Sequence, residues 1–154
     1  MSRRPLIGLL LVFAAMVAGC SGEDDATQSA PSSPLEALIA AHGEPVKTYT
    51  VRAEVVELPD PARAGTSFRL RHEAIDDFID KRGKVVGMSS MTMPFPVADG
   101  VAFPPGLKPG DKVQVTFAQW LEPLLRYEVY EIEALPSDTE LVFRAADPPS
   151  EQPD

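Results

Sequence analysis

Cysteine is nearly absent from this chain of 154 residues, and the single one, Cys20, lies close to the N-terminus. The folded part of the chain can therefore form no internal disulfide and no thiolate metal site. Basic clusters are missing too, because 14 basic residues stand against 23 acidic ones and none of the Lys and Arg residues cluster beyond the N-terminal leader. A nucleic-acid partner would need a basic face, so that class is excluded.

The common catalytic signatures are also missing. The sequence contains no G-x-S-x-G, no H-E-x-x-H and no phosphate-binding glycine loop, and His42 and His72 are not spaced as a catalytic or zinc pair. Asp76, Asp77 and Asp80 could be a Ca²⁺ or acid–base cluster, but a solvated face explains such carboxylates better. We therefore expect no enzymatic activity.

The N-terminal 19 residues are predicted to be a lipoprotein-type signal peptide. Arg3 and Arg4 precede an apolar run that is too short for a comfortable bilayer span. Val17-Ala18-Gly19-Cys20 resembles a bacterial lipobox, which makes Cys20 the expected lipidated residue; a free thiol after an ordinary signal peptide is the alternative. The net charge of −9 becomes −11 once the leader and its two arginines are removed. We expect a domain anchored by lipid to a bacterial envelope membrane and facing the periplasm.

Composition divides the remaining chain into three parts. Residues 20–46 are rich in Ser, Pro, Ala and acidic residues and are predicted to be a flexible tether, although Leu35–Gly43 has helical spacing and a glycine stop. Residues 47–136 have the length of one small domain. Residues 137–154 are predicted to be an acidic, largely disordered tail, in which Leu141–Phe143 could add a short strand.

Alternating apolar residues predict an all-β domain with five short strands. Five strands in a chain of this size most economically close into a small barrel, because closure removes exposed edges. One short helical insertion is expected at Glu73–Asp80. The expected strands lie around residues 49–55, 67–72, 91–93, 113–117 and 129–133.

Methionine is confined to one stretch once the leader is removed: Met88, Met91 and Met93. Methionine normally fills gaps throughout a core, so this confinement indicates that the sulfur atoms have a function. Met91 and Met93 share one face of an expected strand, and His72 ends a neighbouring one. Thioether and imidazole ligands suit Cu(I) or Ag(I). Two core methionines and a hydrogen-bonded histidine remain the structural alternative.

Three segments together resemble the CusF-like periplasmic copper and silver binding domains: Arg71-His72-Glu73-Ala74-Ile75, Met91-Thr92-Met93-Pro94-Phe95 and Gly106-Leu107-Lys108-Pro109-Gly110-Asp111-Lys112-Val113. The resemblance covers nearly the whole domain and implies a five-stranded OB-like barrel. It also implies that His72, Met91 and Met93 bind one Cu(I) or Ag(I) ion.

A tryptophan caps the ion in the best-known members of that family, three residues before the first strand methionine, where this chain has Met88. A thioether can coordinate where a ring face only attracts a cation, so Met88 is a candidate fourth ligand. Trp120 is the other residue that could cap the ion, although an aromatic residue in the barrel wall is the simpler interpretation.

These features predict a monomeric metallochaperone or buffer for Cu(I) or Ag(I). The expected partner is a copper efflux or copper-insertion protein, and the sequence does not choose between the two. The alternative is a metal-independent module for protein or glycan interaction, in which the methionines form an apolar contact patch.

Overall fold

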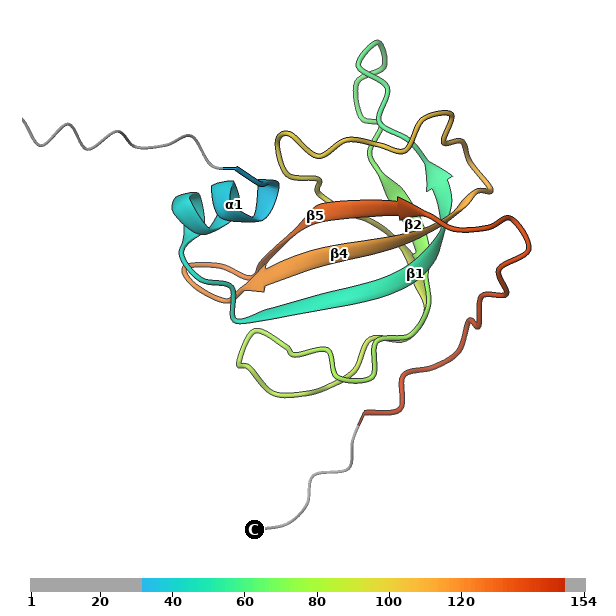
Figure 1. Cartoon of the computed structure of the whole chain (residues 1–154). Helices are drawn as coiled ribbons and strands as arrows, with labels where there is room; N and C mark the ends of the chain where they lie inside the picture. Colours follow the sequence, from blue (N-terminus) through green and yellow to red (C-terminus); the bar gives the residue numbers. More distant parts are fainter. Residues whose placement is uncertain (1–31, 149–154) are drawn as a thin grey trace, which may run out of the picture.

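The computed structural model describes residues 32–148, and its main element is one antiparallel five-stranded sheet (Figure 1). The strand order is β3-β2-β1-β4-β5, so the long β1 lies at the centre. The expected all-β fold with five strands is therefore confirmed, whereas residues 1–19 and Cys20 lie outside the described residues. The strands are β1 (Lys47–Glu57), β2 (Arg69–His72), β3 (Met91–Pro94), β4 (Lys112–Trp120) and β5 (Arg126–Ala134).

Alternation of side chains along the central strands builds the core. In β1, Tyr49, Val51, Ala53 and Val55 are buried while most residues between them are more exposed, as expected for a strand with one face on a core. β4 contributes a matching buried row that begins at Val113. Tyr49 stacks on Phe117 of β4, with 5.1 Å between ring centroids.

A bulge in β5 changes the alternation that the sequence predicts for this strand. The pairing register shifts by one residue, because Thr116 pairs with Glu131 while the next residue of β4, Phe117, pairs with Val129. Val129 and Ile132 are consequently both buried, although they are three positions apart. Strict alternation would have placed the two side chains on opposite faces of the sheet. The extra residue of the bulge brings both to the buried face.

The two edges of the sheet come together at one point. After β3, the chain forms an isolated parallel bridge between Val97 and Val129 of β5. Val129 donates its amide to the carbonyl of Pro96, and Ala98 donates its own to the carbonyl of Val129. β3 and β5 themselves form no ladder, so closure of the sheet into a full OB-like barrel remains an expectation.

One short helix, α1 (Pro34–His42), precedes the sheet, and it lies within the segment expected to be a tether. Ser33 and Glu36 form a reciprocal capping box at its start. Leu38 is buried with Ala98 and Trp120, and burying a leucine contributes roughly 1.5–3 kcal/mol. The folded unit therefore begins before residue 47. No helix within residues 32–148 is long and apolar enough to cross a membrane.

The prediction of a helix at Glu73–Asp80 is wrong. This segment is extended and turns back on itself, with isolated antiparallel bridges between Ile75 and Met88 and between Ile79 and Val85. The carboxylate of Asp80 accepts the amides of Arg82 and Lys84 and so closes the turn. Backbone bonds to the returning chain replace the helical ones, while the apolar residues Ile75, Phe78 and Ile79 still reach the core.

The C-terminal segment also differs from the expectation of a largely disordered tail. Residues 142–148 are hydrogen-bonded to the domain beside residues 73–76 and 87–90. They form no regular strand, although Leu141–Phe143 was a candidate for one. In Figure 1 the chain that leads from the end of β5 to this segment, and the segment itself, are drawn in red beside the sheet.

Candidate metal centre

The pairing of β2 with β3 brings His72 directly opposite Met91, and Leu70 opposite Met93. Opposite residues of an antiparallel pair project from the same face, with roughly 4.5–5.5 Å between their Cβ atoms. His72 and Leu70 are fully buried, so this face is the core face. Thr92 shares the outer face with Arg71, as the alternation in the sequence predicted.

Pro94 fits the end of this strand because β3 is an edge strand. Phe95 donates its amide to the carbonyl of Phe68 at 2.7 Å. Hydrogen-bonded and non-hydrogen-bonded pairs alternate along the ladder, so Pro94, opposite Arg69, takes a non-hydrogen-bonded position. The amide that proline lacks would have pointed to the open edge. The expectation of an edge strand is therefore confirmed.

The imidazole of His72 is held in one tautomer. Its Nδ1 lies 2.6 Å from the backbone carbonyl of Glu73, and because a carbonyl can only accept, Nδ1 carries the hydrogen. In the neutral ring, Nε2 then presents a lone pair. Among the described side chains, this Nε2 is the one buried nitrogen or oxygen atom that has no hydrogen-bond partner.

Burial disfavours the charged form of this ring. Loss of solvent lowers the pKa of His72 below its usual value near 6.5, and the bond to the Glu73 carbonyl opposes the shift only in part. A buried nitrogen without a partner costs free energy, so such an atom in a native structure calls for an explanation. A bound metal ion would provide one, because metal-bound histidines commonly donate their other ring N–H to a carbonyl.

Met88 and Met93 lie on the core side of the same region. Both line a small cavity of about 10 Å³ together with Phe78, Phe95 and two further aromatic residues, Phe117 and Tyr127. The ring of His72 contacts Phe95 edge-on, with 5.7 Å between centroids. Phe95 thus links the histidine to the cavity that the two methionines share.

Met91 differs from the other two methionines in its exposure. Half of its surface is accessible, whereas Met88 and Met93 pack against the hydrophobic core. The backbone of Met88 exchanges two hydrogen bonds with Ile75, three residues after His72. The structure therefore brings all four predicted ligand residues to one end of the sheet, one of them at the solvent boundary.

Trp120 does not reach this end of the sheet. Across β1, His72 lies beside Ala53, which pairs with Val113. Trp120 stands seven residues farther along β4, roughly 23 Å away at strand spacing. Its indole donates to the carbonyl of Gly43 and packs against α1. The structure thus identifies it as an aromatic residue of the domain wall, and a capping role is excluded in this arrangement.

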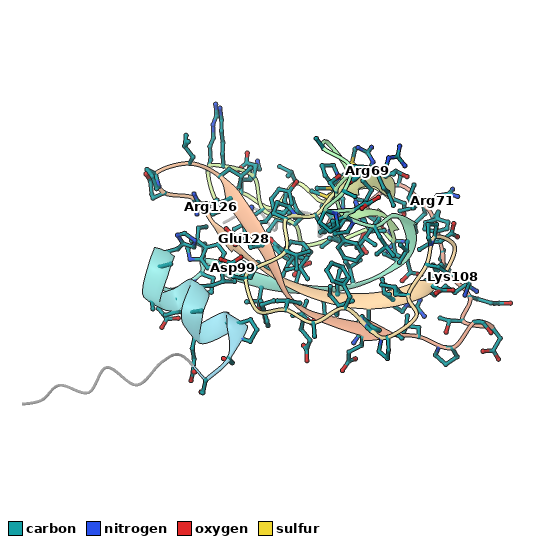
Figure 2. All side chains as sticks on the ribbon, turned by 90° about the horizontal axis from the view of Figure 1, so that it is seen from above. Arg69, Arg71, Asp99, Lys108, Arg126 and Glu128 are labelled. Carbon is teal, nitrogen blue, oxygen red and sulfur yellow. The ribbon has the colours of Figure 1, made fainter. Side chains whose placement is uncertain are left out.

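Figure 2 shows the two ends of the sheet in one view. Arg126 and Glu128 of β5 lie beside α1, and Arg69 and Arg71 of β2 lie at the opposite end, where His72 is located. Within residues 32–148, no group of three or more His, Cys, Asp or Glu side chains that could hold a metal ion is present. The aspartates considered as a cluster each have other partners: Asp76 pairs with Arg144, and Asp77 with Lys47.

Glu73 is the residue that the sequence did not single out. Its carbonyl orients His72, and its carboxylate makes a bidentate ion pair with Arg52, at 2.8 Å for both hydrogen bonds. The amide of Glu73 also bonds to the carbonyl of Arg52. The one signal in the sequence is its place directly after the candidate ligand, but the apolar spacing of residues 73–80 predicts a helix that does not form.

No family model matches the sequence, and neither a curated protein nor a solved structure matches the chain.

Proposed function

We propose that this protein binds Cu(I) or Ag(I) in the cell envelope and passes the ion on as a metallochaperone or buffer, without enzymatic turnover. The observation that carries this proposal is the unpartnered Nε2 of His72, buried directly opposite Met91. The ion is cargo, held by His72, Met91 and Met93. Met88, which shares a cavity with Met93, is the candidate fourth ligand.

The chemistry of these groups supports a soft monovalent ion. A neutral imidazole nitrogen and thioethers are the ligands that Cu(I) prefers, while hard cations prefer oxygen. Thioethers do not titrate and cannot be lost to disulfides, so they suit an oxidising compartment. Sulfoxide formation is their weakness, and half-exposed Met91 is the sulfur most open to it.

Transfer of the ion follows from the position of β3 at the edge of the sheet. An acceptor can approach Met91 from solvent, whereas His72 is fully buried. Ligand exchange would begin at Met91 and end at the imidazole. An efflux system or a copper-insertion protein is the expected acceptor, and the proposed lipid at Cys20 would keep the domain at the membrane.

An anaerobic Cu(I) titration against a chromophoric Cu(I) chelator tests this function. The chain should carry Cys20→Ser, because its only thiol would otherwise bind Cu(I) itself. We expect one equivalent of Cu(I) to bind, and the Met91→Leu/Met93→Leu variant to lose at least about a hundredfold in affinity. Changing a residue that only orients a metal ligand typically costs about 10–100-fold in affinity, and removing the ligands themselves should cost more.

Thr92→Ser is the matched control, because this residue lies between the two methionines on the opposite face. Leucine keeps the volume of methionine and removes the sulfur, so circular dichroism should show folded protein in every case. A folded parent that binds no Cu(I) would refute the proposal and favour a metal-independent interaction module.

A further inference from the structure

Residues 142–148, here called the C-terminal strap, contact two segments that lie on either side of the turn closed by Asp80. One is residues 73–76, which directly follow His72. The other is residues 87–90, which contain Met88 and lead into Met91. Both segments therefore carry or adjoin the proposed ligands, and the strap is hydrogen-bonded to each of them.

The first segment receives the strap through two carboxylates. The amide of Val142 donates to Glu73 at 2.6 Å. The guanidinium of Arg144 makes two bonds with Asp76, at 2.8 and 2.6 Å, and the amide of Asp147 donates to the same carboxylate at 2.7 Å. Two-point pairing of a guanidinium with a carboxylate fixes orientation as well as distance.

The second segment receives the strap through its backbone and two serines. Ser90 donates its amide to the carbonyl of Arg144, and its hydroxyl accepts the Arg144 amide, both at 2.9 Å. The hydroxyl of Ser89 accepts the amide of Ala146 at 3.0 Å. At Gly87, an added Cβ would lie only 2.8 Å from Cβ of Ala146, so the close approach of the strap requires glycine there.

Glu73 connects the strap to the histidine itself. The carbonyl of this residue fixes the ring of His72, while its carboxylate holds Arg52 and the amide of Val142. Next to this contact, the guanidinium of Arg71 lies over the ring of Phe143, 3.9 Å from the centroid. A change in strap docking would therefore act on the residue that orients the proposed ligand.

We propose that the C-terminal strap is a latch that holds the histidine-bearing and methionine-bearing segments together and thereby slows loss of the bound ion. This inference rests on the proposed Cu(I) or Ag(I) binding. Met91 stays half-exposed beside the docked strap, so an acceptor can engage it first. Release of the strap then loosens the two segments and completes the transfer.

Matched substitutions at adjacent aspartates test the latch. Asp76→Asn removes the charge that holds Arg144, and Asp77→Asn removes the equivalent charge on the neighbouring residue, which pairs with Lys47 at 2.7 Å. Both are made in the full-length chain carrying Cys20→Ser. Two quantities are measured: amide hydrogen exchange at Val142, Arg144, Ala146 and Asp147 without metal, and the rate of Cu(I) loss to excess chelator.

We expect Asp76→Asn to accelerate exchange at these amides and to speed Cu(I) loss by about two- to fivefold, the range that an exposed ion pair provides. Asp77→Asn should change neither quantity. A chain ending after Glu140 removes the strap entirely and should lose Cu(I) roughly tenfold faster, since several hydrogen bonds are then lost together.

The outcomes separate the latch from the metal site. Faster exchange in Asp76→Asn with an unchanged rate of Cu(I) loss, or unchanged loss from the shortened chain, overturns the latch while leaving the proposed function intact. A parent that binds no Cu(I) refutes both, although its exchange data would still report whether the strap docks.

Discussion

The two histidines of the described chain lie at opposite ends of the sheet, and each has an aromatic ring edge-on beside it. His72 contacts Phe95 at 5.7 Å, and His42 contacts Trp120 at 5.5 Å between centroids. Their polar surroundings differ completely. The Arg126 guanidinium lies 2.9 Å from Nε2 of His42, and Glu128 lies 3.6 Å from it, whereas Nε2 of His72 has no polar partner.

The difference shows how burial and partners together distinguish a structural histidine from a candidate ligand. The side chain of His42 keeps 27% of its exposure, and it ends α1, where a partial positive charge is favourable. These charged neighbours are sufficient to explain the position of the His42 side chain. His72 is buried among apolar side chains, and its Nε2 has no hydrogen-bond partner. The residue opposite it in β3 is Met91. Only the second environment suits a soft ion.

The same substitution at both histidines gives the largest expected contrast. We expect His72→Gln to weaken Cu(I) binding by roughly a hundredfold or more, because it removes the one imidazole of the site and ligand loss exceeds the cost of changing a ligand's supports. His42→Gln should leave the affinity unchanged. The measurement is the anaerobic chelator competition described above, with urea unfolding of both variants as the control for folding. Equal losses of Cu(I) affinity in the two variants would contradict the assignment of His72, and not His42, as the ligand.

Met88 could belong either to the proposed metal site or to the hydrophobic core, and a substitution decides between the two. It lines the cavity with Met93 and also packs against the core, so both interpretations have a contact in their favour. If its sulfur coordinates, we expect Met88→Leu to weaken Cu(I) binding by about tenfold with little change in stability, since the swap conserves volume. X-ray absorption at the copper edge should then count one sulfur fewer. An unchanged affinity and sulfur count would assign Met88 to the core.

The sequence was informative where the signal was local. Alternation located the five strands, and the prolines after Met93 indicated an edge strand, because both depend on neighbouring residues. The predicted helix at Glu73–Asp80 failed because its apolar spacing suits a helix, while the partners that decide its conformation, Val85 and Met88, lie on the returning chain.

The strap could not be predicted for a similar reason. Arg144 and Asp76 are 68 residues apart, and an acidic, proline-containing tail gives no local sign of where it docks. The partnerless Nε2 of His72 is likewise a property of packing. A pattern of residues can identify a histidine as a candidate ligand, but only the fold shows which of its ring nitrogens has no hydrogen-bond partner.

The smallest expected effect is a pH dependence of stability in the metal-free protein, at the end of the sheet where His72 is buried. Because burial lowers the pKa of His72 below 6.5, the unfolded chain takes up a proton more readily than the folded one. The resulting stability is present above pH 6.5 and is lost as the pH falls toward the lower pKa of the folded state. We expect the urea midpoint to fall between pH 7 and pH 5.5, where carboxylates contribute little. His72→Gln should flatten this slope, whereas an unchanged slope in this variant would show that the buried ring is not the group that titrates.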